Sequence, residues 1–145
     1  MSAWAVFKGL DGCASFLHDH AGEEMEHMQQ LFTYVNETGA LAKLGVIDAP
    51  PTDYESVTDV FDKIYEHERH VTQEINNLVD AALAEKDYST FNFLQWYVAE
   101  QHEEERLFKS ILDKIQIIGT ESRGLYHFDQ QISGLAAARK GTSVA

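Results

Sequence analysis

The chain has 145 residues, a length that suits one domain with its own core. Its net charge of -13 at pH 7 argues against nucleic acid or an anionic membrane surface as a partner. Cys13 is the only cysteine, which excludes an intrachain disulfide and a thiolate metal cluster and favours a reducing cytoplasm. No apolar run is long enough to span a bilayer, so we expect a soluble cytoplasmic domain.

The spacing of apolar residues predicts an all-α chain, because no segment shows a convincing alternation of period two. Residues 1–8 are compatible with a helix but begin without a capping residue. A second helix is predicted over residues 12–38. Residues 40–55 contain Pro50 and Pro51 and predict a long connection that crosses the length of a helix bundle.

The second half of the chain also predicts helices. Ser56 is a suitable N-cap, with Asp59 three residues later. The predicted segments are helices over 56–85, 88–118 and 122–137, the last of them short, and a tail over 138–145.

Polar residues occupy positions where helical spacing calls for core side chains. In the helix 88–118 the apolar stripe is interrupted for one turn by Gln101 and Glu104 and then resumes. Glu24 lies on the stripe of the second helix, and Glu68 lies on that of the third. One such glutamate would usually be a structural acid with a salt bridge. Three helices that each carry one favour a shared metal site, because buried carboxylates need a partner.

Glu24 and His27 form a Glu-x-x-His sequence, which is typical of carboxylate metal sites in helix bundles but is weak evidence alone. Carboxylate and imidazole ligands favour iron or manganese, although zinc binds the same groups. Two ions bridged by carboxylates suit two-electron chemistry with oxygen or peroxide. The other histidines are interpreted as surface or bundle residues: His18, His20, His67, His70, His102 and His127.

Three segments, residues 21–28, 91–105 and 124–126, resemble the bacterial non-haem ferritins. The resemblance extends over essentially the whole chain, including the long connection and the short fifth helix. It implies a ferritin-like four-helix bundle. It also implies a hollow homo-oligomer of twenty-four subunits that oxidises Fe(II) with O2 or H2O2 and stores a ferric mineral.

The resemblance also implies roles for individual residues. Glu24 resembles the carboxylate that bridges the two irons of the ferroxidase centre, and His27 resembles a ligand of the first iron. Glu68 and Glu104 resemble ligands of the second iron, with Gln101 adjacent. The residues that resemble ligands of a third iron site, together with Glu104, are Glu23, Glu100 and Glu103.

The chain departs from the family pattern at its start. The family's first helix is long and supplies one more glutamate ligand and a tyrosine, whereas Met1–Trp4 resembles only the end of that helix. Either the protein starts upstream of Met1 or the first helix is truncated. In the second case, water would complete the first iron site, and an apolar groove would be exposed where the missing helix packs.

Three functions are therefore compared. The first is an iron-storage ferritin subunit with ferroxidase activity. The second is a non-catalytic shell or assembly subunit, which co-assembles with a full-length ferritin or serves structure alone. The third is another carboxylate-bridged oxidase, which is disfavoured because Gln101 and Glu104 replace the second Glu-x-x-His that such enzymes use.

Overall fold

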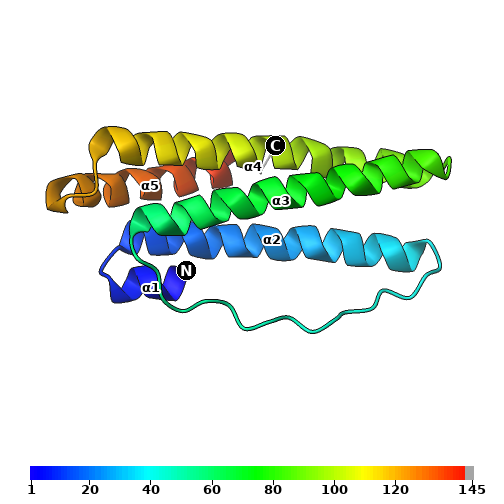
Figure 1. Cartoon of the computed structure of the whole chain (residues 1–145), viewed down its shortest axis with the longest axis horizontal. Coiled ribbons are helices and arrows are strands. Elements are labelled where there is room, and N and C mark those ends of the chain that lie inside the picture. The colour runs from blue at the N-terminus through cyan, green and yellow to red at the C-terminus, as the bar shows by residue number, and fades with distance from the viewer. Residues whose placement is uncertain (143–145) are drawn as a thin grey trace. The chain divides into compact units, whose positions relative to one another are not determined.

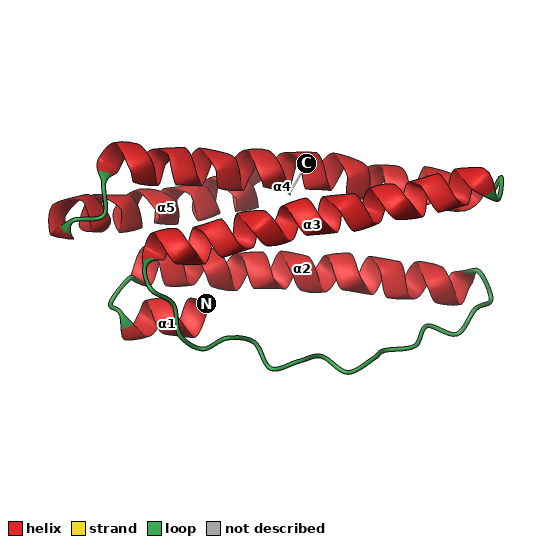
Figure 2. Ribbon diagram, viewed as in Figure 1, coloured by secondary structure: helices red, strands yellow, loops and turns green. Residues whose placement is uncertain are grey.

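The structure is a computed structural model that describes the backbone of residues 1–142 and the side chains of residues 1–135. Within this range the helices are α1 (Ser2–Phe7), α2 (Asp11–Glu37), α3 (Val57–Ala84), α4 (Tyr88–Ile118) and α5 (Ser122–Thr142). Residues 1–142 contain no strand, which agrees with the predicted all-α chain (Figure 2). None of these helices is long and apolar enough to cross a membrane.

The helix bounds agree closely with the prediction, except at the C-terminal end. α2, α3 and α4 begin and end within one residue of their predicted positions. The last helix was predicted to end at residue 137, but α5 continues to Thr142. Residues 136–140 are alanine, arginine and lysine, which favour helix strongly, so the helix extends beyond its apolar stripe. Residues 143–145 of the predicted tail lie outside the described part of the chain.

The described chain forms two compact units. One unit contains α1, α2, the long connection up to Tyr54, and α5. In this unit α2 packs against both α1 and α5. The other unit contains α3 and α4, which are antiparallel and pack along their lengths (Figure 1).

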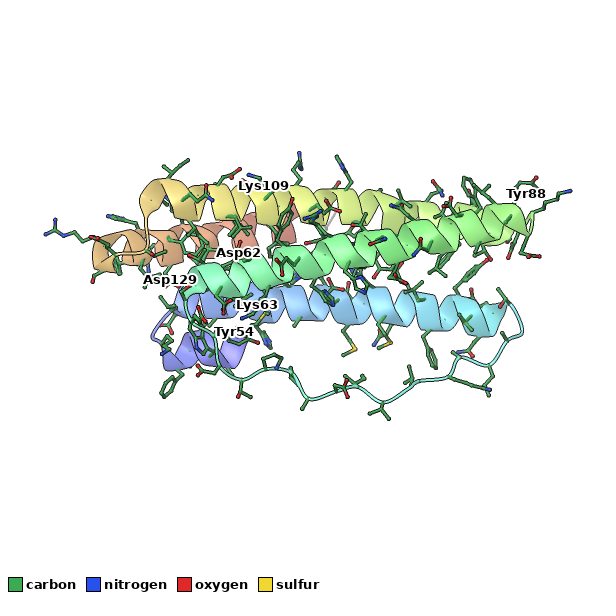
Figure 3. The ribbon with its side chains drawn as sticks, viewed as in Figure 1. Tyr54, Asp62, Lys63, Tyr88, Lys109 and Asp129 are labelled. Carbon is green, nitrogen blue, oxygen red and sulfur yellow. The ribbon has the colours of Figure 1, made fainter. Side chains whose placement is uncertain are left out.

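In the first unit, the beginning of α2 is held by a side chain from α5. The Asp129 carboxylate accepts hydrogen bonds from the backbone N–H groups of Gly12, at 3.1 Å, and Cys13, at 2.8 Å (Figure 3). These donors belong to the first turn of α2, where no carbonyl of the helix itself is available to them. The negative charge also complements the positive end of the helix dipole. Asp129 therefore attaches α5 to the start of α2.

Replacing Gly12 with alanine is expected to loosen this attachment. A Cβ atom at Gly12 would overlap the backbone carbonyl oxygen of Asp129. Because a backbone atom cannot rotate away, we expect the free energy of unfolding to fall by about 1–3 kcal/mol. Gly22 is the matched control in the same helix, since a Cβ there meets nothing within 4 Å. Gly22→Ala should raise stability by about 0.5–1 kcal/mol. Thermal unfolding of both variants checks this prediction, and a neutral Gly12→Ala would contradict it.

The Cys13 thiol lies in the same buried contact. Burial, and secondarily the Asp129 carboxylate, raise the pKa of Cys13 far above its ordinary value of 9.0. The thiol therefore stays protonated at neutral pH, and a thiol reacts with alkylating agents only as its thiolate. We expect iodoacetamide at pH 8 to modify the native protein at least about tenfold more slowly than the protein in guanidinium chloride. Equal rates would show that the thiol is accessible and ionised.

The long connection is anchored at its end and exposed along its middle. The ring of Tyr54 packs edge-on against Trp4 of α1, with 5.7 Å between centroids, and its hydroxyl donates to the Pro51 carbonyl at 3.0 Å. The predicted connection, residues 40–55, contains no helix. Several of the large apolar side chains here are strongly exposed, namely Leu41, Leu44, Val46 and Ile47.

In the second unit both helices begin at a side-chain cap. The Ser56 hydroxyl accepts a hydrogen bond from the Asp59 N–H at 3.1 Å, which confirms the predicted start of α3. The Asp87 carboxylate accepts from the Thr90 N–H at 3.0 Å at the start of α4. The Thr90 hydroxyl also donates to this carboxylate, at 2.6 Å, and the hydroxyl and the N–H together lower the pKa of Asp87.

The buried face of α2 differs from the predicted one. Apolar spacing predicted a buried stripe through Leu17, Ala21, Glu24, Met28, Leu31 and Val35. Leu17 is buried and Glu24 and Leu31 are half-buried, but Ala21, Met28 and Val35 are exposed. The buried residues of the helix also include Phe16, His20 and His27, so the buried face is shifted from the predicted one by part of the roughly 100° that separates neighbouring residues. Because α2 carries apolar residues on both faces, their spacing alone could not select the buried one.

Candidate metal centre

Four metal-ligating side chains lie together along α2. The imidazole of His20 lies 3.7 Å from both carboxylates that follow it, through Nδ1 to Glu23 Oε2 and through Nε2 to Glu24 Oε1. The other oxygen of Glu24, Oε2, lies 3.5 Å from His27 Nδ1. These residues are three or four positions apart, so one face of α2 presents them all. The Glu24 carboxylate thus lies between two imidazoles.

Burial differs along this face. His20 and His27 are buried, whereas Glu23 and Glu24 are partly exposed. A buried histidine beside a carboxylate is a common arrangement in metal sites, because the imidazole and the carboxylate can bind the same cation. The predicted ligands Glu23, Glu24 and His27 are therefore brought together within α2.

The second unit holds three more predicted ligands. Glu68 on α3 and Gln101 and Glu104 on α4 are all buried, with exposed fractions of 2%, 1% and 0%. The Gln101 amide donates to the side-chain Oε2 and to the backbone carbonyl of Glu68, both at 3.2 Å. This pair of hydrogen bonds joins α3 to α4 and fixes the orientation of the Glu68 carboxylate. Glu104 lies one turn beyond Gln101, on the same face of α4.

The chemistry of these groups fits a hard or borderline cation. Burying an ionised carboxylate costs several kcal/mol unless a positive charge compensates for it. Gln101 orients Glu68 but is uncharged, so it does not supply that compensation. Oxygen and imidazole nitrogen donors suit iron, manganese or zinc, and the donor set contains no thiolate.

The remaining predicted ligands lie on the outer part of α4. Glu100 is half-buried and Glu103 is exposed. Trp96 stacks on Tyr97, with ring centroids 4.6 Å apart.

A cavity of about 220 Å³ lies between α3 and α4. Its lining residues are Thr72, Ile75, Asn76, Val98, Gln101, His102 and Glu105. Gln101 belongs both to this lining and to the hydrogen bonds that hold Glu68.

Sequence reasoning missed two histidines near these groups. His20 was interpreted as a surface or bundle residue, yet it is buried between two carboxylates. Its position four residues before Glu24 was the available signal, because residues at this spacing are neighbours on a helix. His67 is exposed, with Nδ1 3.9 Å from Glu68 Oε1. The sequence position of His67 did not distinguish it from an ordinary surface histidine.

A family model described as a ferritin-like domain matches residues 1–118. The chain belongs to the ferritin family. A probable bacterial non-heme ferritin-like protein of Haemophilus influenzae is 53% identical over 136 residues, which is 94% of this chain and 82% of that protein. A bacterial non-heme ferritin of Campylobacter jejuni is 51% identical over 140 residues, which is 97% of this chain and 84% of that protein.

Solved ferritin structures are similar in fold as well. An open-pore ferritin from Archaeoglobus fulgidus has a TM-score of 0.89 and 39% identity, covering 92% of this chain and 82% of the other. A ferritin from Chlorobium tepidum has a TM-score of 0.81 and 53% identity, covering 91% and 81%. The predicted ferritin-like, all-α fold is confirmed.

Proposed function

We propose that this chain is an iron-storage ferritin subunit. It oxidises Fe(II) at a carboxylate-bridged di-iron ferroxidase centre and retains Fe(III) as a mineral inside a multisubunit shell. The observation that carries the proposal is the complete burial of carboxylates among the core residues of α3 and α4, at Glu68 and Glu104. Such a position is costly for a structural acid and suits a ligand for a cation.

Each proposed ligand has a separate role. Glu24 bridges two cations because its two oxygens face different neighbours, and His27 binds one of those cations. Glu68 and Glu104 are ligands of the second cation, and Gln101 orients Glu68. Glu23, Glu100 and Glu103 hold or transfer further iron. These acidic ligands also favour loss of an electron from iron, since anions stabilise Fe(III) more than Fe(II).

Iron is the substrate of this reaction. Two Fe(II) ions each lose one electron, and O2 takes up both electrons and two protons to give H2O2. If H2O2 is the oxidant, the same two electrons and two protons give two water molecules. The lone cysteine agrees with a reducing cytoplasm, where Fe(II) persists.

Assembly into a homo-oligomer is part of the proposal. Exposed apolar side chains follow α2 and the connection after it, among them Met25, Phe32, Val46 and Ile47. Monomers rarely leave so many large apolar groups in water, whereas subunit interfaces bury them. We propose a shell of twenty-four copies, or one in which this chain co-assembles with other ferritin subunits.

Oxidation and sizing test the proposal together. Fe(II) added in air should be oxidised well above the buffer rate, followed by the absorbance of Fe(III), and light scattering should report a large assembly. A stable monomer would overturn the storage function. A shell that leaves the buffer rate unchanged would instead support a non-catalytic shell subunit.

A further inference from the structure

His20 has contacts that its predicted surface role does not explain. Its side chain is only 8% exposed, and its ring stacks on Phe16, with 6.4 Å between centroids and 14° between planes. Phe16 is itself 2% exposed, so it holds the imidazole in one orientation. In that orientation each ring nitrogen faces a different carboxylate, Glu23 or Glu24.

The distance between Nε2 and Glu24 suits a shared cation better than a direct hydrogen bond. A hydrogen bond between nitrogen and oxygen spans about 2.7–3.2 Å, whereas both His20 contacts measure 3.7 Å. Two ligand atoms that each lie about 2.1 Å from one cation are about 3.4 Å apart in tetrahedral geometry. Nε2 of His20 and Oε1 of Glu24 thus need to approach by only a few tenths of an ångström.

Metal binding through Nε2 requires one particular tautomer of His20. A neutral imidazole carries a hydrogen on one ring nitrogen and a lone pair on the other. Histidines that bind metal usually donate the remaining N–H to a carboxylate, which fixes the ring. Nδ1 of His20 faces Glu23 Oε2 and Nε2 faces Glu24 Oε1, so the tautomer with its hydrogen on Nδ1 places the Nε2 lone pair toward Glu24.

We infer that His20 is a further ligand for divalent cations, through Nε2, and shares the cation with Oε1 of Glu24. Stacking on Phe16 orients the ring, and Nδ1 faces Glu23 Oε2 at 3.7 Å. His27 Nδ1 and Glu24 Oε2 form the equivalent pair on the other side of the carboxylate, 3.5 Å apart. The two oxygens of Glu24 are therefore each accompanied by one imidazole. This inference rests on the proposed function, because it assigns a residue to the same iron ligands.

Co²⁺ is a suitable probe because air does not oxidise it readily at such sites and its absorption reports its ligands. The measurements are the number and affinity of bound Co²⁺ ions and the hyperfine-shifted imidazole N–H signals in proton NMR. His20→Ala should lose one shifted imidazole signal and weaken one class of Co²⁺ sites by about 10- to 100-fold. His18→Ala is the matched control, since His18 is exposed on the same helix.

His20→Gln keeps a polar side chain of similar length but removes the imidazole. It therefore tests the proposed ligand if His20→Ala does not fold. Unchanged Co²⁺ affinity and shifted signals in the folded His20 variants would overturn the inference. If the wild-type protein oxidises Fe(II) while these variants bind Co²⁺ normally, the inference fails and the proposed function stands. If the wild-type protein neither binds Co²⁺ nor oxidises Fe(II), both fail.

Discussion

Glu24→Ala is expected to slow Fe(II) oxidation by roughly 100-fold. Both oxygens of this carboxylate face an imidazole, so its removal affects two proposed cation positions at once. Mutation of groups that only orient metal ligands lowers metal affinity or activity by about 10- to 100-fold. Removal of a ligand shared by two cations should lower the oxidation rate by at least the upper value. Stopped-flow absorbance after mixing with Fe(II) in aerated buffer gives the initial rate. The variant should remain folded, because Glu24 is partly exposed.

Glu26→Ala is the matched control for Glu24. It removes a carboxylate two residues further along α2, where the side chain is exposed. It changes the net charge by the same amount, so it separates loss of a ligand from loss of negative charge. Glu26→Ala should oxidise Fe(II) at the wild-type rate. Equal rates in the Glu24 variant and the wild type would show that Glu24 is not an iron ligand.

Phe108→Ala is expected to lower the free energy of unfolding by about 3–5 kcal/mol. Phe108 on α4 and Phe61 on α3 are completely buried, with ring centroids 6.4 Å apart. Removing one ring leaves a cavity between the helices that carry Glu68 and Glu104. Since a typical domain is stable by only about 5–15 kcal/mol, the loss is a large fraction of the total. Guanidinium denaturation followed by circular dichroism measures it.

Phe7→Ala is the corresponding surface control. The Phe7 side chain on α1 is 84% exposed, so its removal should change stability by less than about 0.5 kcal/mol. A Phe108 variant as stable as this control would mean that the contact between α3 and α4 does not depend on the aromatic pair. Oxidation measured well below the unfolding midpoint would then show whether the cavity also displaces Glu104.

The helices could be predicted from sequence because each has a local signal. Ser56 marks the start of α3, and the apolar stripe of α3 and α4 continues on both sides of the polar interruption. The end of α5 lacked such a signal, because the alanines near it have high helix propensity and do not mark where the helix ends. The buried face of α2 could not be chosen either, because that choice depends on which face meets α1 and α5.

The site was predictable in its residue types and less so in its contacts. Glu68 and Glu104 could be recognised because a carboxylate in a core position conflicts with the apolar stripe. The burial of His20 could not, because it follows from the orientation of α2 and from stacking on Phe16. The roles of the predicted ligands stay predictions until metal binding is measured.

Asp129 has a consequence for the order in which the chain folds. The backbone donors it satisfies, at Gly12 and Cys13, precede it by 117 and 116 residues. During synthesis the hydrogen bonds to the first turn of α2 therefore cannot form until residue 129 has been added to the chain. The antiparallel pair of α3 and α4 has contacts of shorter sequence separation and can form earlier. A chain truncated after residue 121 should keep a protected α3–α4 pair, while the first amide hydrogens of its α2 exchange freely.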